Sequence, residues 1–260
     1  MEIYDLILFA GQSNMAGRGI TTDKWKEPAP KIKEDAGVEY RAVSDPEHLH
    51  KIEEPFGVNE NNPEGIYEPG MKTGSMVTAF VNAYYEKTRI PVLAISASKG
   101  GSAISEWQGK EDYLSDAVKR VKNAVSYAEK NQIQIRHKYV LWCQGETDGD
   151  QGTPLEKYKE LFDNMFSQLR AIGIEKLFLI TIGEYNGCKG WENAYKEIRK
   201  LQIKLSENMK DVILVSDRFH TMQSRGLMKD DFHYFQKAYN EVGEEAGRAA
   251  GTYVLNLEAK

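Results

Sequence analysis

Five short runs of Val, Ile, Leu and other apolar residues recur along the chain, separated by longer stretches with the spacing of amphipathic helices. Each run is almost continuously apolar, so we expect strands that are covered on both faces, as in a parallel sheet. Strands that alternate with helices predict a doubly wound α/β fold, in which ligands bind at the carboxyl ends of the strands. The predicted strands are Tyr4–Ala10, Pro91–Ser98, His137–Gln144, Lys176–Gly183 and Asp211–Asp217.

The stretches between these runs carry apolar residues every three or four positions, which predicts helices that pack on the sheet. One segment, Ile20 to Lys72, breaks the alternation, because it is rich in Pro, Glu, Lys and Asn and has few apolar runs. A loop of this length inside a compact domain is usually functional or disordered, and we expect an ordered insertion near the mouth of the site. No internal repeat interrupts the pattern, so we predict one domain over residues 1–260. The predicted helices are 76–88, 113–130, 153–173, 193–209 and 234–251.

Composition narrows the possible partners. The chain has 34 Lys plus Arg against 39 Asp plus Glu, a formal net charge of -5, which gives no general attraction to nucleic acid. No run approaches the roughly 20 apolar residues that a membrane span needs. The first residues lack a basic region ahead of the apolar run, and we therefore expect a cytoplasmic protein. Cys143 and Cys188 have no spacing typical of disulfide frameworks or zinc sites, so we expect no metal. The oligomeric state stays open.

Chemically useful residues follow the predicted strands, where topology brings them to one edge of the sheet. A serine, a glycine pair, a side-chain amide and an Asp-x-x-His pattern are the parts that acyl transfer requires. Serine needs a base to take its proton, a carboxylate must orient that base, and donors must stabilise the oxyanion. The serine alone could equally cap a helix or turn the chain. These residues are Ser13, Gly100, Gly101, Gln144, Glu146, Asp148, Asp230 and His233.

Four blocks of sequence resemble those of the SGNH (GDSL-like) hydrolases, in the form found in carbohydrate esterase family 6 and the sialate O-acetylesterase-like domains. They occur in the family's order and after the corresponding strands. Together they cover nearly the whole chain. The blocks are "GQSNMAGRG" from Gly11, "SKGGSAISEW" from Ser98, "WCQGETD" from Trp142 and "DDFHY" from Asp230.

The resemblance implies a flavodoxin-like three-layer sandwich with a five-stranded parallel sheet. It implies Ser13 as the nucleophile, His233 as the base and Asp230 as the partner of that base. The oxyanion donors would be the N–H groups of Ser13 and Gly101 and the side chain of Gln144, which stands where many family members have asparagine. It implies no cofactor. Residues expected to support the site or bind substrate are Gln12, Asn14, Arg18, Gly100, Trp107 and Glu146.

Three of these assignments have a competing interpretation. A second Asp-x-x-His pattern, Asp217 and His220, has the same spacing as the first. His233 is preferred because it directly precedes the last helix, as in the family. Arg18 would form a polar wall of the pocket or a surface salt bridge. Trp107 would offer an aromatic face to a sugar ring or pack against the insertion.

The predicted function is hydrolysis of O-acetyl esters on a carbohydrate through an acetyl-Ser13 intermediate, with no cofactor. An acetylated xylo-oligosaccharide and an O-acetyl sialic acid both fit the resemblance as small-molecule substrates. The alternatives are a general lipolytic or thioesterase SGNH enzyme and a carbohydrate-binding protein without turnover. Neither nucleic acid nor membrane is an expected partner.

Overall fold

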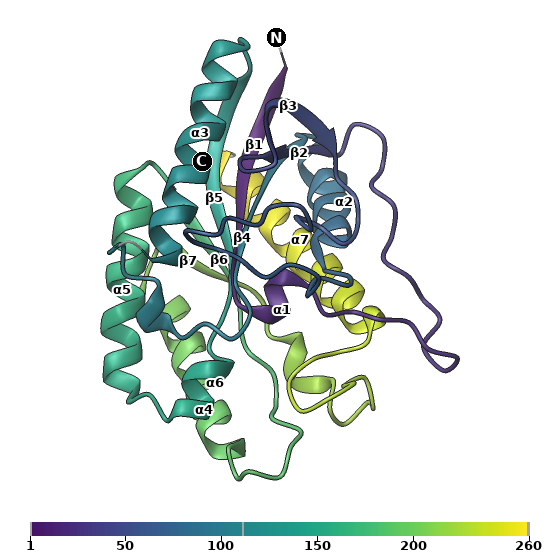
Figure 1. Cartoon of the computed structure of the whole chain (residues 1–260), viewed down its shortest axis with the longest axis vertical. Coiled ribbons are helices and arrows are strands. Elements are labelled where there is room, and N and C mark those ends of the chain that lie inside the picture. The colour runs from purple at the N-terminus through teal and green to yellow at the C-terminus, as the bar shows by residue number, and fades with distance from the viewer. Residues whose placement is uncertain (1, 111, 259–260) are drawn as a thin grey trace.

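A seven-stranded mixed sheet lies at the centre of the structure, a computed structural model that describes residues 2–110 and 112–258 (Figure 1). The strand order is β3-β2-β4-β1-β5-β6-β7. All five predicted strands are present, as β1, β4, β5, β6 and β7, and they pair in parallel. The strands are β1 Ile3–Gly11, β2 Gly37–Arg41, β3 Asp45–Lys51, β4 Val92–Ser98, β5 Gln134–Cys143, β6 Lys176–Ile180 and β7 Val212–Ser216.

The prediction of five strands is wrong by two, because the insertion after β1 supplies β2 and β3. β2 runs parallel to β4, and β3 pairs with β2 in the antiparallel direction. These two strands lie at the edge of the sheet, and most side chains of β3 are exposed or half-buried. An edge strand whose side chains are exposed to solvent needs no apolar run, so the hydrophobic pattern gave no signal for β3.

The helices form a layer on each side of the sheet (Figure 1). α3, α5 and α6 cover one face, and α2 and α7 cover the other. Alternate residues of β1 divide between the two cores, with Leu6 and Leu8 on the α3 side and Ile7 and Phe9 on the α7 side. The five predicted helices are present, and two short ones, α1 and α4, are additional. The helices are α1 Ser13–Ala16, α2 Val77–Thr88, α3 Tyr113–Lys130, α4 Glu146–Gln151, α5 Leu155–Ala171, α6 Glu192–Asn208 and α7 Gln236–Glu258.

The carboxyl ends of the parallel strands meet at one edge, where α1 directly follows β1 (Figure 1). Gly11 ends β1 with a φ of +139°, and a Cβ at this position would lie 2.0 Å from the carbonyl oxygen of Cys143 on β5. Only glycine fits this close approach of two strands. The chain therefore leaves the sheet abruptly and presents the next residues at its edge. Within the described part of the chain, no helix is both long and apolar enough to cross a membrane.

Candidate active site

Ser13, His233 and Asp230 form a chain of hydrogen bonds at this edge of the sheet. The Ser13 Oγ lies 2.9 Å from His233 Nε2, and His233 Nδ1 lies 3.0 Å from Asp230 Oδ2. Ser13 comes from α1, and the other two residues come from the turn before α7. An ionised Asp230 can only accept, so Nδ1 carries the proton and Nε2 is free to take the serine proton. This is the arrangement that a serine nucleophile requires.

The local hydrogen bonds hold Asp230 in its charged form. Its Oδ1 accepts from the backbone N–H groups of Phe232, at 2.9 Å, and His233, at 2.7 Å. Burial raises the pKa of Asp230, but the hydrogen bonds from His233 and Phe232 outweigh it and leave that pKa well below its usual value. Asp230 is therefore ionised near neutral pH, where it can stabilise an imidazolium.

The competing pair, Asp217 and His220, is engaged elsewhere. The Asp217 carboxylate forms an ion pair with Arg199 and accepts a hydrogen bond from Thr181 Oγ1 at 2.6 Å. His220 Nδ1 contacts Asp217 itself, and the two residues line a surface hollow that contains no serine. The structure thus brings His233, and not His220, to Ser13.

Asn14 connects the turn that carries the nucleophile to the turn that carries the base. Its Nδ2 donates to Glu146 Oε1 at 2.6 Å and to the carbonyl oxygen of Phe232 at 3.1 Å. Its Oδ1 accepts from the Tyr239 hydroxyl at 2.7 Å. Asn14 has no exposed surface. It therefore orients the residue next to His233 and cannot touch substrate directly.

Gln12 and Glu146 hold the loop after β5 against the turn that carries Ser13. Gln12 Oε1 accepts from the backbone N–H of Gly145 at 3.0 Å. Glu146 is almost fully buried, and burial raises the pKa of its carboxyl group. Its Oε2 has no hydrogen-bond partner among the described residues. Both side chains border the pocket described below.

The structure does not support the predicted roles of Gln144 and Trp107. Gln144 is fully buried, and its amide nitrogen donates to Ser102 O at 3.1 Å and to Asp148 Oδ2 at 2.5 Å, so no amide hydrogen remains for an oxyanion. Trp107 is also fully buried, donates from Nε1 to Ser102 Oγ at 3.0 Å and packs edge-on against Trp142. Both residues hold the loops beneath the site and are out of reach of a sugar.

A cavity of about 370 Å³ opens over Ser13 and His233. Its size is within the range of small-molecule sites. Glu68 and Met71 bring the insertion into its wall, although no motif in the sequence marked them. Four other lining residues were missed: Lys99, Thr147 and Phe232 stand within the recognised blocks, and Asp150 stands just after one. The lining residues are Gln12, Ser13, Arg18, Glu68, Met71, Lys99, Gly100, Gly101, Glu146, Thr147, Asp150, Phe232 and His233.

Two backbone N–H groups at the cavity suit an oxyanion. Ser13 is the first residue of α1, where a helix leaves its N–H groups without an intrahelical acceptor. Gly101 also lines the cavity, with a φ of +69°, a conformation that favours glycine. Arg18 forms a buried ion pair with Glu68 at 2.9 Å, so it is a polar wall of the cavity and not a surface salt bridge.

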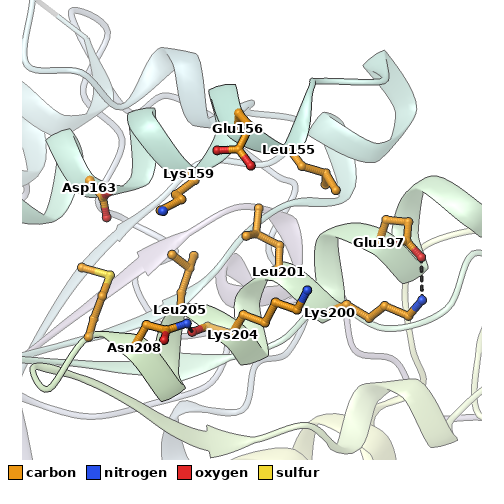
Figure 2. A pocket seen from close by; sticks show the side chains of 11 residues that line it. Leu155, Glu156, Lys159, Asp163, Glu197, Lys200, Leu201, Lys204, Leu205 and Asn208 are labelled. Atoms are coloured by element: carbon orange, nitrogen blue, oxygen red, sulfur yellow. Dashed lines mark hydrogen bonds and ion pairs between the residues drawn. The ribbon is translucent and has the colours of Figure 1, made fainter.

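A second hollow lies between α5 and α6 (Figure 2). Leu155, Leu201 and Leu205 lie in it, and charged side chains surround them, including Lys200, which donates to Glu197 at 2.6 Å. It contains neither serine nor histidine. This hollow therefore lacks the nucleophile and the base that acyl transfer requires. Across residues 2–110 and 112–258, no group of three or more His, Cys, Asp or Glu side chains is arranged to hold a metal ion.

Comparison with known proteins places this geometry in a family. Residues 3–252 match the family model described as carbohydrate esterase, sialic acid-specific acetylesterase. The chain belongs to this family of carbohydrate esterases. The match spans all four sequence blocks, so the predicted family is confirmed.

Individual relatives are distant in sequence. One from Arabidopsis thaliana, named "Probable carbohydrate esterase", is 26% identical over 238 residues, covering 83% of this chain and 83% of that protein. A solved structure of the same Arabidopsis locus has a TM-score of 0.71 at 21% identity, covering 96% of this chain and 98% of that one. A carbohydrate acetylesterase from Xanthomonas citri has a TM-score of 0.59 at 18% identity, covering 95% and 55%. The acetylxylan esterase Axe2 from Geobacillus stearothermophilus has 0.53 at 12%, covering 95% and 94%. These structures share the α/β fold.

Proposed function

We propose that this carbohydrate esterase removes O-acetyl groups from a sugar through an acetyl-Ser13 intermediate. The observation that carries the proposal is His233, which lies within hydrogen-bond distance of both Ser13 Oγ and the Asp230 carboxylate. The family supports ester hydrolysis on a carbohydrate. The similar structures from Xanthomonas and Geobacillus, a carbohydrate acetylesterase and an acetylxylan esterase, favour acetyl as the acyl group.

In the first half-reaction, Ser13 Oγ attacks the acetyl carbonyl carbon while His233 Nε2 takes the serine proton. The negative charge that develops on the carbonyl oxygen is stabilised by the N–H groups of Ser13 and Gly101. The bond between the carbonyl carbon and the sugar oxygen then breaks. The sugar oxygen takes the proton from His233 and leaves as an alcohol, and acetyl-Ser13 remains.

In the second half-reaction, His233 takes a proton from water as the water oxygen attacks the acetyl carbon. The bond from that carbon to Ser13 Oγ breaks, the serine oxygen recovers the proton from His233, and acetic acid leaves and loses its remaining proton to solvent to give acetate. Asp230 stays ionised throughout and holds His233 in the required tautomer. No step needs a cofactor.

The walls of the cavity favour a short acyl group. Met71 and Phe232 are its large apolar side chains, and most of the other lining residues are charged or polar. A long acyl chain would need an extended apolar surface to be held out of water. Acetylated xylo-oligosaccharides and O-acetyl sialic acid both remain candidate substrates, and a general lipolytic SGNH hydrolase is the alternative.

The proposal is tested with p-nitrophenyl esters of increasing chain length, wild-type protein, Ser13→Ala, and Ser105→Ala as an exposed serine control. We expect the highest kcat/KM with the acetyl ester, no turnover by Ser13→Ala and full turnover by Ser105→Ala. A serine-directed phosphonate should label residue 13. Activity that rises with chain length would favour the lipolytic alternative. An unlabelled, inactive wild-type protein would favour a carbohydrate-binding role.

A further inference from the structure

Glu68, in the insertion, is hydrogen-bonded to two of the turns that line the candidate active site. It is 7% exposed, and its Oε2 accepts two hydrogen bonds, from Gly100 N at 2.7 Å and from Arg18 Nη2 at 2.9 Å. Its own backbone N–H donates to Asn61 Oδ1 at 3.0 Å. One carboxylate oxygen thus connects the insertion, the turn after β1 that carries Ser13, and the glycine turn after β4.

This contact decides which glycine can serve the oxyanion. The N–H of Gly100 is already donated to Glu68, so it is not free for a developing negative charge. The N–H of Gly101, in contrast, belongs to the next peptide, whose carbonyl oxygen is that of Gly100. Lys99 Nζ donates to this oxygen at 2.9 Å. Because a trans peptide is planar, with C=O and N–H pointing in opposite directions, fixing the Gly100 carbonyl also fixes the Gly101 N–H.

The packing around Gly100 shows how closely the parts fit. A Cβ at this position would lie 2.4 Å from Arg18 Nη2, 2.8 Å from Glu68 Oε2 and 3.4 Å from Ser13 Cβ. Gly100 is therefore held between the Arg18–Glu68 ion pair and the nucleophile. Without a counter-ion, the Glu68 carboxylate would repel the negative charge of an oxyanion. The guanidinium of Arg18, 2.9 Å away, compensates the charge of Glu68.

We propose that Glu68 is a positioning residue for the oxyanion site. Glu68 holds Gly100 at its N–H group, and Lys99 holds Gly100 at its carbonyl oxygen, so that the Gly101 N–H is fixed before substrate binds. This inference rests on the proposed esterase function. It gives the insertion a role in the rate of the reaction and not only in the shape of the cavity. A preorganised donor needs no reorganisation as charge develops, which is where its contribution to rate comes from.

The test compares Glu68→Met, which removes the acceptor, with Glu68→Gln, whose amide oxygen can still accept from Gly100. With p-nitrophenyl acetate we expect Glu68→Met to lower kcat by about 10- to 100-fold, less than the loss of a whole oxyanion donor, with KM changed by less than about 3-fold. Glu68→Gln should recover most of kcat. Affinity for methylboronic acid, which forms a tetrahedral adduct on serine, should fall in parallel with kcat/KM.

The matched control is Glu60→Met. Glu60 is another buried carboxylate of the insertion, and it accepts from the backbone N–H groups of Val43, at 3.0 Å, and Ser44, at 3.1 Å, outside the cavity. The Glu60→Met variant should lose thermal stability, as Glu68→Met should, but it should keep the wild-type kcat. If Glu68→Met does not fold, Lys99→Met tests the inference instead, because Lys99 is only half-buried and its replacement disturbs the fold less. We expect Lys99→Met to have a lower kcat and a lower affinity for methylboronic acid than the wild type.

The inference would be overturned if folded Glu68→Met had the wild-type kcat. If Glu68→Met does not fold, a wild-type kcat in Lys99→Met would overturn it. So would equal losses in Glu68→Gln and Glu68→Met, because the amide keeps the acceptor. A wild-type protein that hydrolyses no ester would instead refute the proposed function, so the two failures are distinguishable.

Discussion

Replacing Asp230 by Asn changes the tautomer of His233 while leaving the turn intact. Asn Oδ1 can still accept from the backbone N–H groups of Phe232 and His233, which Asp230 Oδ1 accepts at 2.9 and 2.7 Å. Asn Nδ2 then occupies the position of Asp230 Oδ2, 3.0 Å from His233 Nδ1. An amide nitrogen can only donate, so Nδ1 must accept and the ring proton moves to Nε2. Nε2 then faces Ser13 Oγ with a proton and cannot remove another.

The expected loss follows from this change of tautomer. The same Asp→Asn substitution in a serine protease triad lowers kcat by about 10⁴-fold, equivalent to about 5.5 kcal/mol of transition-state stabilisation. We expect a loss of about 10³- to 10⁴-fold in kcat for Asp230→Asn. The cost in folding stability should stay below about 1 kcal/mol, because the side chain of Asp230 is partly exposed and solvent screens its charge.

The assay measures kcat with p-nitrophenyl acetate and the free energy of unfolding in urea for Asp230→Asn and for Asp217→Asn. Asp217 belongs to the second Asp-x-x-His pattern, and its carboxylate is bound to Arg199 and Thr181. Asp217→Asn should lower stability and keep kcat within about 2-fold, because its partners are structural. A kcat for Asp230→Asn within tenfold of wild type would contradict the role of Asp230 in setting the tautomer of His233, as would an equal loss in Asp217→Asn.

Three further predictions use other parts of the structure. His233→Ala should abolish turnover and His220→Ala should largely keep it, and the opposite pattern in initial rates would reverse the assignment. Tyr239→Phe should lower the free energy of unfolding by about 1–3 kcal/mol, because it leaves the buried Asn14 Oδ1 without its donor; an unchanged urea midpoint would contradict this. Burial lowers the pKa of Lys72 from 10.5 to about 8, so between these values the unfolded chain binds more protons and stability rises with pH. Relative to Lys72→Met, wild type should therefore gain up to about 3 kcal/mol of stability between pH 7 and 10.5, and a constant difference in urea titrations would contradict this.

The sequence predicted the buried parts of the fold better than its edge. β1, β4 and the second half of β5 are enclosed on both faces, and that enclosure requires the continuous apolar runs that marked them. β3 is largely exposed, and its sequence "DPEHLHK" carries no periodic apolar signal. β3 pairs with β2, and β2 joins the sheet by pairing with β4, which lies far away in the sequence.

In the candidate site, too, some residues were predicted from the sequence and others depend on tertiary packing. Ser13 and His233 stand in blocks of characteristic sequence, so the resemblance located them. Trp107 stands in such a block too, but its burial against Trp142 depends on packing that the block does not encode. Glu68 lies in a polar segment where a glutamate is ordinary, and its contact with Gly100 appears only when the insertion folds over the sheet edge.

Acetate release from defined acetylated sugars tests whether Ser13 carries out deacetylation of a carbohydrate. Wild-type protein and Ser13→Ala are incubated with acetylated xylo-oligosaccharides and with O-acetyl sialic acid, and free acetate is measured over time. We expect rapid release from at least one of these sugars by the wild type and none above background by Ser13→Ala. Equal release by both proteins, or none from any acetylated sugar by a wild type that hydrolyses longer acyl esters, would contradict it.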